Sequence, residues 1–290
     1  VAVVGKFSTS EALGSVGSTS TLIMLFTGFL IGMGCGVNVK AAQYLGAKSK
    51  EDLTETIHTS LILCTAIGAA LSVVCFAFAE PMLTLLNTKP NLLPGAVLYF
   101  KIYALGMPAL GIFNFGSAVM SANGDTRRPL IYLTVAGVLN VILNLFFVIV
   151  CHMAAEGVAI SSVISQYLSA ALILVHMFRE KDDCGLRLSN LRLYEFRSAS
   201  VLRLGLPAGI QSAIFAIANL FVQVGVNSFE STMVEGNAAA ANADALVFNI
   251  MAAFYTACTS FMGQNWGAGK RERALKSYFI SLTYSFAAGL

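Results

Sequence analysis

The chain has 290 residues, of which 57% are hydrophobic and 11% are charged, and its formal net charge is +3. A soluble domain carries about 25% charged residues, so this composition excludes an ordinary water-soluble enzyme or binding domain. The mean hydropathy is +0.74. We therefore predict an all-α fold, a polytopic membrane helix bundle.

Apolar segments that can cross about 30 Å of hydrocarbon follow one another along the chain. Six are complete, a seventh follows them, and an eighth begins near Leu275. Residues Val1–Val4 have the character of the tail of a further span. The seven predicted spans are Thr21–Val39, Ile57–Ala79, Val97–Met120, Leu130–Val150, Gly157–Phe178, Gly205–Val226 and Ala239–Phe261.

The connections between these spans differ in charge. One alternate set holds every Lys and Arg except Lys6, Lys89 and Lys101. Because Lys and Arg are enriched in cytoplasmic loops, we expect these basic loops in the cytoplasm and the bundle in the plasma (inner) membrane. The positive net charge then reflects insertion polarity. No basic stripe with interleaved aromatic residues occurs, so we expect no nucleic-acid partner.

A short motif occurs twice at a fixed distance. Gln43–Ala47 reads Gln-Tyr-Leu-Gly-Ala and Gln264–Ala268 reads Gln-Asn-Trp-Gly-Ala, an offset of 264 − 43 = 221 positions. An echo in one register between apolar segments indicates duplication, an architecture common in secondary transporters. An even number of spans separates the copies. The repeats are therefore predicted to be parallel, with both motifs on the cytoplasmic face.

The repeat length predicts a parent of about 440 residues with two six-helix units, of which about eight helices lie here. The chain is expected to be a fragment that lacks most of the first helix and the last part of the second unit. We expect an N-terminal lobe at 1–178, a cytoplasmic linker at 179–203 that lies along the membrane surface, and the start of the C-terminal lobe at 204–290. The motif copies are expected to anchor the cytoplasmic face rather than to touch a substrate.

Uncharged amide side chains mark the interior of the predicted spans. Lipid offers no hydrogen bonds, so such groups must face the bundle interior or a water-filled cavity. Single amides can simply join neighbouring helices, whereas four along one side of a helix favour a cavity wall. The predicted cavity residues are Asn114, Asn140, Asn144 and Gln166 in the first lobe and Gln211, Asn219, Gln223 and Asn227 at the start of the second.

Asp244 is the only carboxylate well inside a predicted span. A carboxylate there must be paired, hydrated or protonated. Asp244 is therefore the candidate for coupling to Na⁺ or H⁺, with an ordinary interfacial position as the alternative. The chain has no nucleophile elbow, phosphate loop or Cys-x-x-Cys pair. We expect neither an enzyme nor a metal site, and no cofactor beyond the coupling ion.

Small residues and prolines predict local packing. Gly28, Gly32 and Gly36 recur every four residues and predict a face for close helix contact. Whether this face also slides during transport stays open at this stage. Pro108 and Pro207 are each predicted to kink a helix or to begin one.

Seven stretches occur in a definite order along the chain. They are Met107-Pro108 through Asn114, Asn123-Gly124-Asp125-Thr126-Arg127-Arg128-Pro129-Leu130, Gly137 through Asn144, Gly157 through Gln166, Gly205-Leu206-Pro207 and the two Gln-x-x-Gly-Ala motifs. Together they resemble the multidrug and toxic compound extrusion (MATE) family. The resemblance implies a twelve-helix, two-lobed exporter that works by alternating access. Organic, often cationic compounds leave in exchange for Na⁺ or H⁺.

Two departures from the family pattern concern the coupling ion. Members with a cation site in the first lobe commonly carry an Asp where this chain has Asn144, and another Asp in the first helix, which this chain lacks. The seventh-helix Glu of another branch falls near Phe215. The resemblance therefore leaves Asp244 or a residue of the missing helix to supply the carboxylate.

Two functions remain in view. The first is an ion-coupled exporter of small organic, amphipathic compounds, working as a monomer in the lipid bilayer. The alternative is a flippase for lipid-linked oligosaccharides, which needs a cationic cavity to hold a pyrophosphate. The predicted spans carry amides and aromatic residues but almost no internal Lys or Arg, and this favours the exporter.

Overall fold

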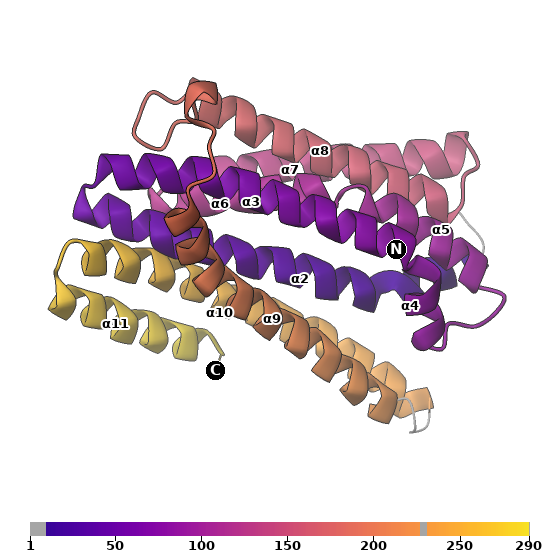
Figure 1. The fold of residues 1–290 in the computed structure, drawn as a ribbon. Coiled ribbons are helices and arrows are strands. Elements are labelled where there is room, and N and C mark those ends of the chain that lie inside the picture. Colours follow the sequence, from indigo (N-terminus) through magenta and orange to yellow (C-terminus); the bar gives the residue numbers. More distant parts are fainter. Residues whose placement is uncertain (1–9, 227–230, 290) are drawn as a thin grey trace.

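The computed structural model describes residues 10–226 and 231–289. These residues are helical over most of their length and include no strand (Figure 1). The predicted all-α membrane bundle is thus confirmed. The α-helices are α2 (Ser10–Ala47), α3 (Lys50–Ala77), α4 (Ala79–Leu85), α5 (Leu93–Ala104), α6 (Met107–Ala122), α7 (Arg127–Leu145), α8 (Ala155–Arg179), α9 (Glu195–Val226), α10 (Ser231–Gly267) and α11 (Arg271–Gly289).

Most predicted spans correspond to single helices that are long and apolar enough to cross a membrane. The third predicted span is instead the pair α5 and α6, bent by 45°. Pro108 lies in the first turn of α6, where a missing backbone N–H needs no partner, so it begins a helix after the bend. The five straight spans among the described residues are Glu11–Ala47, Lys50–Ala77, Arg127–Val150, Ala155–Arg179 and Glu195–Asn219.

The last two predicted spans also form helices. Ala239–Phe261 lies within α10, and the eighth span begins with α11 at Arg271. α9 differs from the prediction because it begins at Glu195, inside the segment expected to be linker, and Pro207 lies within it. Of the two roles predicted for Pro207, that of helix start is therefore wrong. The first turns of α9 form a helix because Val201 is fully buried against the first lobe.

α7 presents an apolar surface outward. Leu130, Val138 and Ile142 are each more than half exposed, and the helix continues into a π-helical turn at Phe146–Val150. Exposed apolar side chains along a whole helix suit contact with lipid chains, which require no polar partners. This helix therefore forms part of the outer wall of the bundle.

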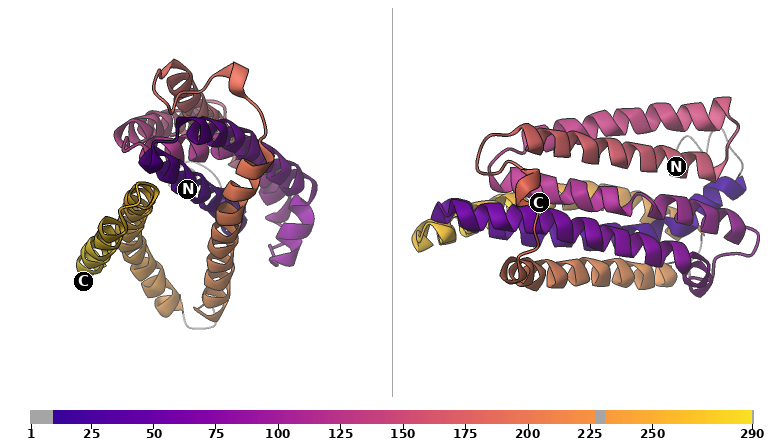
Figure 2. Two further views of the ribbon diagram at one scale, coloured as in Figure 1. Left: turned by 60° about the vertical axis from the view of Figure 1, so that its left-hand side comes forward. Right: turned by 45° about the horizontal axis from the view of Figure 1, so that its top comes forward.

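α2 is the central helix of the described bundle (Figure 1). It packs against α3 and α6 on one side and against α9 and α10 on the other (Figure 2). In the main core, Val37 and Ala41 of α2 meet Ile57 of α3, Phe115 of α6 and Met177 of α8. α2 thus joins the first lobe, residues 10–178, to both long helices that follow the linker.

The predicted glycine face of α2 packs against α9. A Cβ on Gly32 would overlap the backbone of Gly209, and a Cβ on Gly36 would lie 2.5 Å from the backbone nitrogen of Gly205. Only glycine lets two helix backbones approach this closely. The prediction of a close-packing face is confirmed, and its partner is the start of α9.

Candidate functional site

The two motif copies contact each other at one end of the bundle, which we call the motif end. A Cβ on Gly46 would overlap the carbonyl oxygen of Gln264, and a Cβ on Gly267 would overlap the carbonyl oxygen of Gln43. These contacts pair duplicate positions reciprocally, since 43 + 221 = 264 and 46 + 221 = 267. The backbones of α2 and α10 therefore contact each other directly at the motif end.

Buried polar groups reinforce this contact deeper in the bundle. Asn38 of α2 donates from Nδ2 to the Ala118 carbonyl oxygen at 3.0 Å. Its Oδ1 accepts hydrogen bonds from Ser260 at 3.1 Å and from Thr259 at 3.4 Å. Thr259 is the duplicate of position 38, since 38 + 221 = 259. Buried polar groups whose partners are all in place favour one packing arrangement over others.

The sequence prediction missed this role of the motifs. It used the echo as a sign of duplication and expected both copies only to anchor one face. The signal was present in the register, because Asn38 meets its own duplicate Thr259, while Gly46 meets the duplicate of Gln43 and Gln43 meets the duplicate of Gly46. In addition, Gln264 of the second motif donates from Nε2 to the Ala122 carbonyl oxygen of α6 at 2.6 Å.

Towards the opposite end of the bundle, α9 and α10 lead away from the first lobe (Figures 1 and 2). The glycine contacts from α2 to α9 reach as far as Ser212. The polar contacts from α2 to α10 reach as far as Tyr255, whose hydroxyl lies 3.7 Å from the sulfur of Cys35. Close packing among the described residues thus concentrates in the motif half of both helices.

Two predicted cavity amides of the first lobe form a pair on α7. Asn144 donates from Nδ2 to Oδ1 of Asn140 at 2.9 Å. Asn144 is buried, and its own Oδ1 has no hydrogen-bond partner among the described residues. A buried acceptor without a partner carries a desolvation cost, so Asn144 is a polar group whose partner set is incomplete.

Among the described residues, the other two first-lobe amides form no hydrogen bond with this pair. Asn114 donates to the Leu110 carbonyl oxygen of its own helix at 2.9 Å. Gln166 of α8 directs a buried Oε1 against Gly106, and that oxygen has no hydrogen-bond partner in the described part of the chain. The position of all four residues in a cavity wall stays a prediction.

Three of the predicted polar positions of the second lobe have described side chains, two on α9 and one on α10. Gln211 and Asn219 of α9 are exposed, and so is Asp244 of α10. Gln223 is in α9, but its side chain lies outside the described residues, as does Asn227 altogether. Within the described ranges, no group of three or more His, Cys, Asp or Glu side chains could hold a metal ion.

Comparison with known proteins then identifies the family. The MatE family model matches residues 1–146 and 207–290. The chain belongs to the MatE family. The resemblance that the ordered motifs indicated is thereby confirmed, and the match covers both copies of the Gln-x-x-Gly-Ala motif.

Two curated relatives of the MatE chain have names that refer to drug resistance or to transport. It is 28% identical over 270 residues to the probable multidrug resistance protein YpnP of Bacillus subtilis, covering 93% of this chain and 60% of that protein. It is 23% identical over 282 residues to the FAD transporter of Shewanella oneidensis, covering 95% of this chain and 62% of that protein. The chain thus spans about three fifths of the length of these relatives.

Solved structures confirm the fold of this MatE chain. An outward-facing multidrug resistance MATE transporter superimposes with a TM-score of 0.88 at 19% identity, covering 99% of this chain and 64% of that one. An inward-facing MATE transporter superimposes with a TM-score of 0.74 at 21% identity, covering 96% of this chain and 64% of that one.

Proposed function

We propose that the protein is a secondary active transporter that exports organic, amphipathic and often cationic compounds in exchange for Na⁺ or H⁺. The observation that carries this proposal is the direct contact between the duplicated segments at one end of a MatE bundle. An alternating-access carrier needs one end closed while the substrate site communicates with the other. The reciprocal contacts of Gly46 and Gly267 suit such a closed end.

The motif end is proposed to face the cytoplasm. The loops there and the first residues of α3 and α11 carry Lys48, Lys50, Lys270 and Arg271, and Lys and Arg are enriched on the cytoplasmic side of membrane proteins. With this orientation the present arrangement faces outward. The higher TM-score with the outward-facing transporter than with the inward-facing one agrees with this interpretation.

The substrate is proposed to contact amide and aromatic side chains. Asn144 supports this role because it offers a buried acceptor without a partner. Gln211 and Asn219 support it because both are exposed on α9, Gln211 beside Ser212, the last glycine contact with α2, and Asn219 beyond it. Asp244 is proposed as the coupling carboxylate because an exposed acid on the diverging part of α10 is reachable by ions from that end.

A second substrate class is favoured by one relative. The protein from Shewanella oneidensis is named an FAD transporter, and a flavin dinucleotide is aromatic but anionic. Few cationic side chains lie inside the spans of this chain, so we favour cationic and neutral compounds as its substrates. Competition between a cationic dye and FAD would separate the two classes directly.

Efflux from vesicles tests the proposal. The full-length protein is reconstituted, loaded with a cationic dye, and given a sodium gradient or a pH gradient separately. We expect efflux with one of the two gradients and none without a gradient. Absence of efflux for every cationic dye and for FAD, with protein correctly inserted, would contradict the proposed function.

The coupling role of Asp244 has its own test. Asp244→Asn keeps the shape of the side chain and removes its charge, so we expect gradient-driven efflux to fall about tenfold or more while dye binding persists. Glu51→Gln, which neutralises an exposed carboxylate at the motif end, is the matched control and should leave coupling unchanged. Unchanged coupling in Asp244→Asn would remove Asp244 as the ion site.

A further inference from the structure

The segment between α8 and α9, residues 180–194, is fastened to the first lobe, and we call it the strap. Its Leu186 donates from its backbone N–H to the Met177 carbonyl oxygen at 2.8 Å, and the side chains of Leu186 and Cys184 are buried in the main core. The strap is thus a packed element of the first lobe up to the point where α9 begins.

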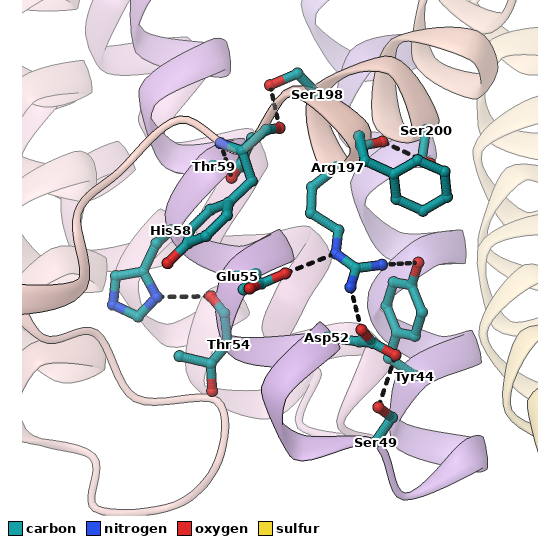
Figure 3. A network of polar contacts seen from close by, with 12 residues as sticks. Tyr44, Ser49, Asp52, Thr54, Glu55, His58, Thr59, Arg197, Ser198 and Ser200 are labelled. Atoms are coloured by element: carbon teal, nitrogen blue, oxygen red, sulfur yellow. Dashed lines mark hydrogen bonds and ion pairs between the residues drawn. The ribbon is translucent and has the colours of Figure 1, made fainter.

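Two α3 side chains, His58 and Thr59, bond to the backbone of the strap, and Figure 3 labels both of them. His58 accepts the Arg187 N–H on Nε2 at 2.9 Å, while its Nδ1 lies 2.7 Å from the Thr54 carbonyl oxygen. Those two partners together require the neutral tautomer with the proton on Nδ1. Thr59 accepts the Tyr194 N–H at 3.3 Å. These bonds therefore fix the start of α9 in position against α3.

Arg197, in the first turn of α9, bonds to the first lobe through all three of its nitrogens (Figure 3). Nε donates to Glu55 at 3.0 Å, one terminal nitrogen donates to the Tyr44 hydroxyl at 3.0 Å, and the other pairs with Asp52. The Arg197 side chain is only 13% exposed. Charge-assisted bonds in such fixed, partly buried geometry are stronger than exposed ion pairs.

Tyr44 connects this network to the closed motif end. It lies between Gln43 and Gly46, the two first-motif residues whose backbones meet the second motif. The Arg197 guanidinium also stacks over the Tyr44 ring, 5.2 Å from its centre. Arg197 therefore braces the first motif from α9 while α10 contacts the same motif from the other side.

We infer that Arg197, with Asp52, Glu55 and Tyr44, is an inter-lobe latch that stabilises the arrangement in which the motif end is closed. The inference deepens the proposed function and rests on it. Opening the motif end requires α9 and α10 to move away from α2, and Arg197 then leaves two carboxylates without a partner. An interaction made in only one of two conformations shifts their populations towards that conformation. Arg197 acts as a positioning residue and does not contact substrate.

Cysteine accessibility tests the latch in the full-length protein. The native cysteines are replaced, and Ala42→Cys is introduced as a reporter, because Ala42 is fully buried against Gly263 at the motif contact. A membrane-impermeant maleimide is applied from the motif side of inside-out vesicles. Arg197→Gln should raise the labelling rate about tenfold, the change that 1.4 kcal/mol produces. Arg197→Lys keeps the positive charge but loses the planar set of N–H donors of the guanidinium, so it should raise the labelling rate less than Arg197→Gln does.

Arg192→Gln is the matched control, because Arg192 lies over the Tyr194 ring at 5.9 Å and shows no ion pair within the described part of the chain. Its labelling rate should equal that of the parent. An unchanged rate in Arg197→Gln, or an equal rise in Arg192→Gln, would overturn the latch. If Arg197→Gln does not reach the membrane, Asp52→Asn with Glu55→Gln must raise labelling instead, and failure to do so overturns the latch equally.

Efflux measured on the same preparations separates the two proposals. A parent that exports dye, with labelling insensitive to Arg197→Gln, contradicts the latch alone. A parent that exports nothing, with labelling that rises in Arg197→Gln, contradicts the proposed transport and supports the latch.

Discussion

The two motif copies share one backbone arrangement and differ in their surroundings. Gly46 and Gly267 each lie against the carbonyl oxygen of the other copy's Gln. The first copy is braced by Arg197 through the acidic start of α3, whereas the duplicate positions of Asp52 and Glu55 are the exposed Arg273 and Lys276. Both copies have the glycine and the glutamine that form the backbone contact. The charged residues next to that contact differ in sign between the copies.

The second copy has a different aromatic environment as well. The guanidinium of Arg271 lies 5.4 Å from the centre of the Trp266 ring, and both residues belong to the second repeat. The cation–π contact of the first copy is at a different motif position and joins Tyr44, whose duplicate is Asn265, to Arg197 of α9. The cationic partner thus comes from a distant segment in the first copy and from the start of the following helix in the second. This difference predicts that glycine substitutions in the two copies lower the free energy of unfolding equally. Charge-neutralising substitutions beside the two copies should lower it unequally.

The largest effect is expected from Gly46→Ala and Gly267→Ala. Each added Cβ overlaps a carbonyl oxygen, so the helices must separate, and each change should lower the free energy of unfolding by about 2–3 kcal/mol. Thermal unfolding of the purified protein measures this. Gly137→Ala is the control because a Cβ there meets nothing within 4 Å, and it should be neutral or slightly stabilising. Clearly unequal effects at the two motif glycines would break the symmetry argument.

The next effect concerns the contact of α2 with α9. Gly32→Ala places a Cβ into the backbone of Gly209, whereas Gly28→Ala meets the Ser212 Cβ at 3.5 Å, an ordinary contact distance. We expect Gly32→Ala to cost about 1–2 kcal/mol and Gly28→Ala to be tolerated. The same unfolding assay applies. Equal loss in both variants would mean that the close approach at Gly32 does not control the stability of this face.

A smaller effect should distinguish the charges of the two copies. Asp52→Asn with Glu55→Gln removes both carboxylate partners of Arg197, and their partial exposure limits the loss to about 1 kcal/mol. Arg273→Gln with Lys276→Gln changes the duplicate positions, which form no ion pair in the described part of the chain, and should stay within about 0.5 kcal/mol. Chemical denaturation compares the pairs. A larger loss from the second pair would reverse the asymmetry proposed here.

The smallest effect is on thiol reactivity at the strap. Burial, followed by the nearby Asp183, Asp182 and Glu180 carboxylates, raises the pKa of the Cys184 thiol to about 12. Its thiolate is therefore scarce at neutral pH and increases as the pH rises towards that value. At pH 7.4 we expect alkylation of Cys184 to be at least about tenfold slower than that of the exposed Cys151. Mass spectrometry of single-cysteine variants measures the ratio, and equal rates would show that the strap does not cover Cys184.

Hydropathy and register predicted most of the fold. The apolar runs predicted the spans, Pro108 predicted a kink or a helix start where α6 begins, and the Gly28–Gly36 spacing predicted a close-packing face. Local patterns of this kind are visible because they repeat with the period of one helix. The start of α9 was not predicted, since Glu195–Arg203 is polar and becomes helical through burial of Val201 against another segment.

The candidate site was less predictable. Amides could be found as polar residues in apolar runs, but only coordinates show that Asn144 bonds to Asn140 and that Gln211 and Asn219 are exposed. The latch could not be found from spacing, because Arg197 lies 142 positions after Glu55. The motif contact was within reach, because two parallel repeats related by one axis bring duplicate positions together near that axis.

A disulfide across the motif end tests the central claim most directly. Asn38→Cys and Ser260→Cys, placed where the two side chains hydrogen-bond at 3.1 Å, are introduced into the full-length protein without its native cysteines. We predict that oxidation cross-links the pair and stops dye efflux, that reduction restores efflux, and that neither single cysteine responds. A cross-linked protein that exports dye at the uncross-linked rate would contradict closure of the motif end as a step in transport.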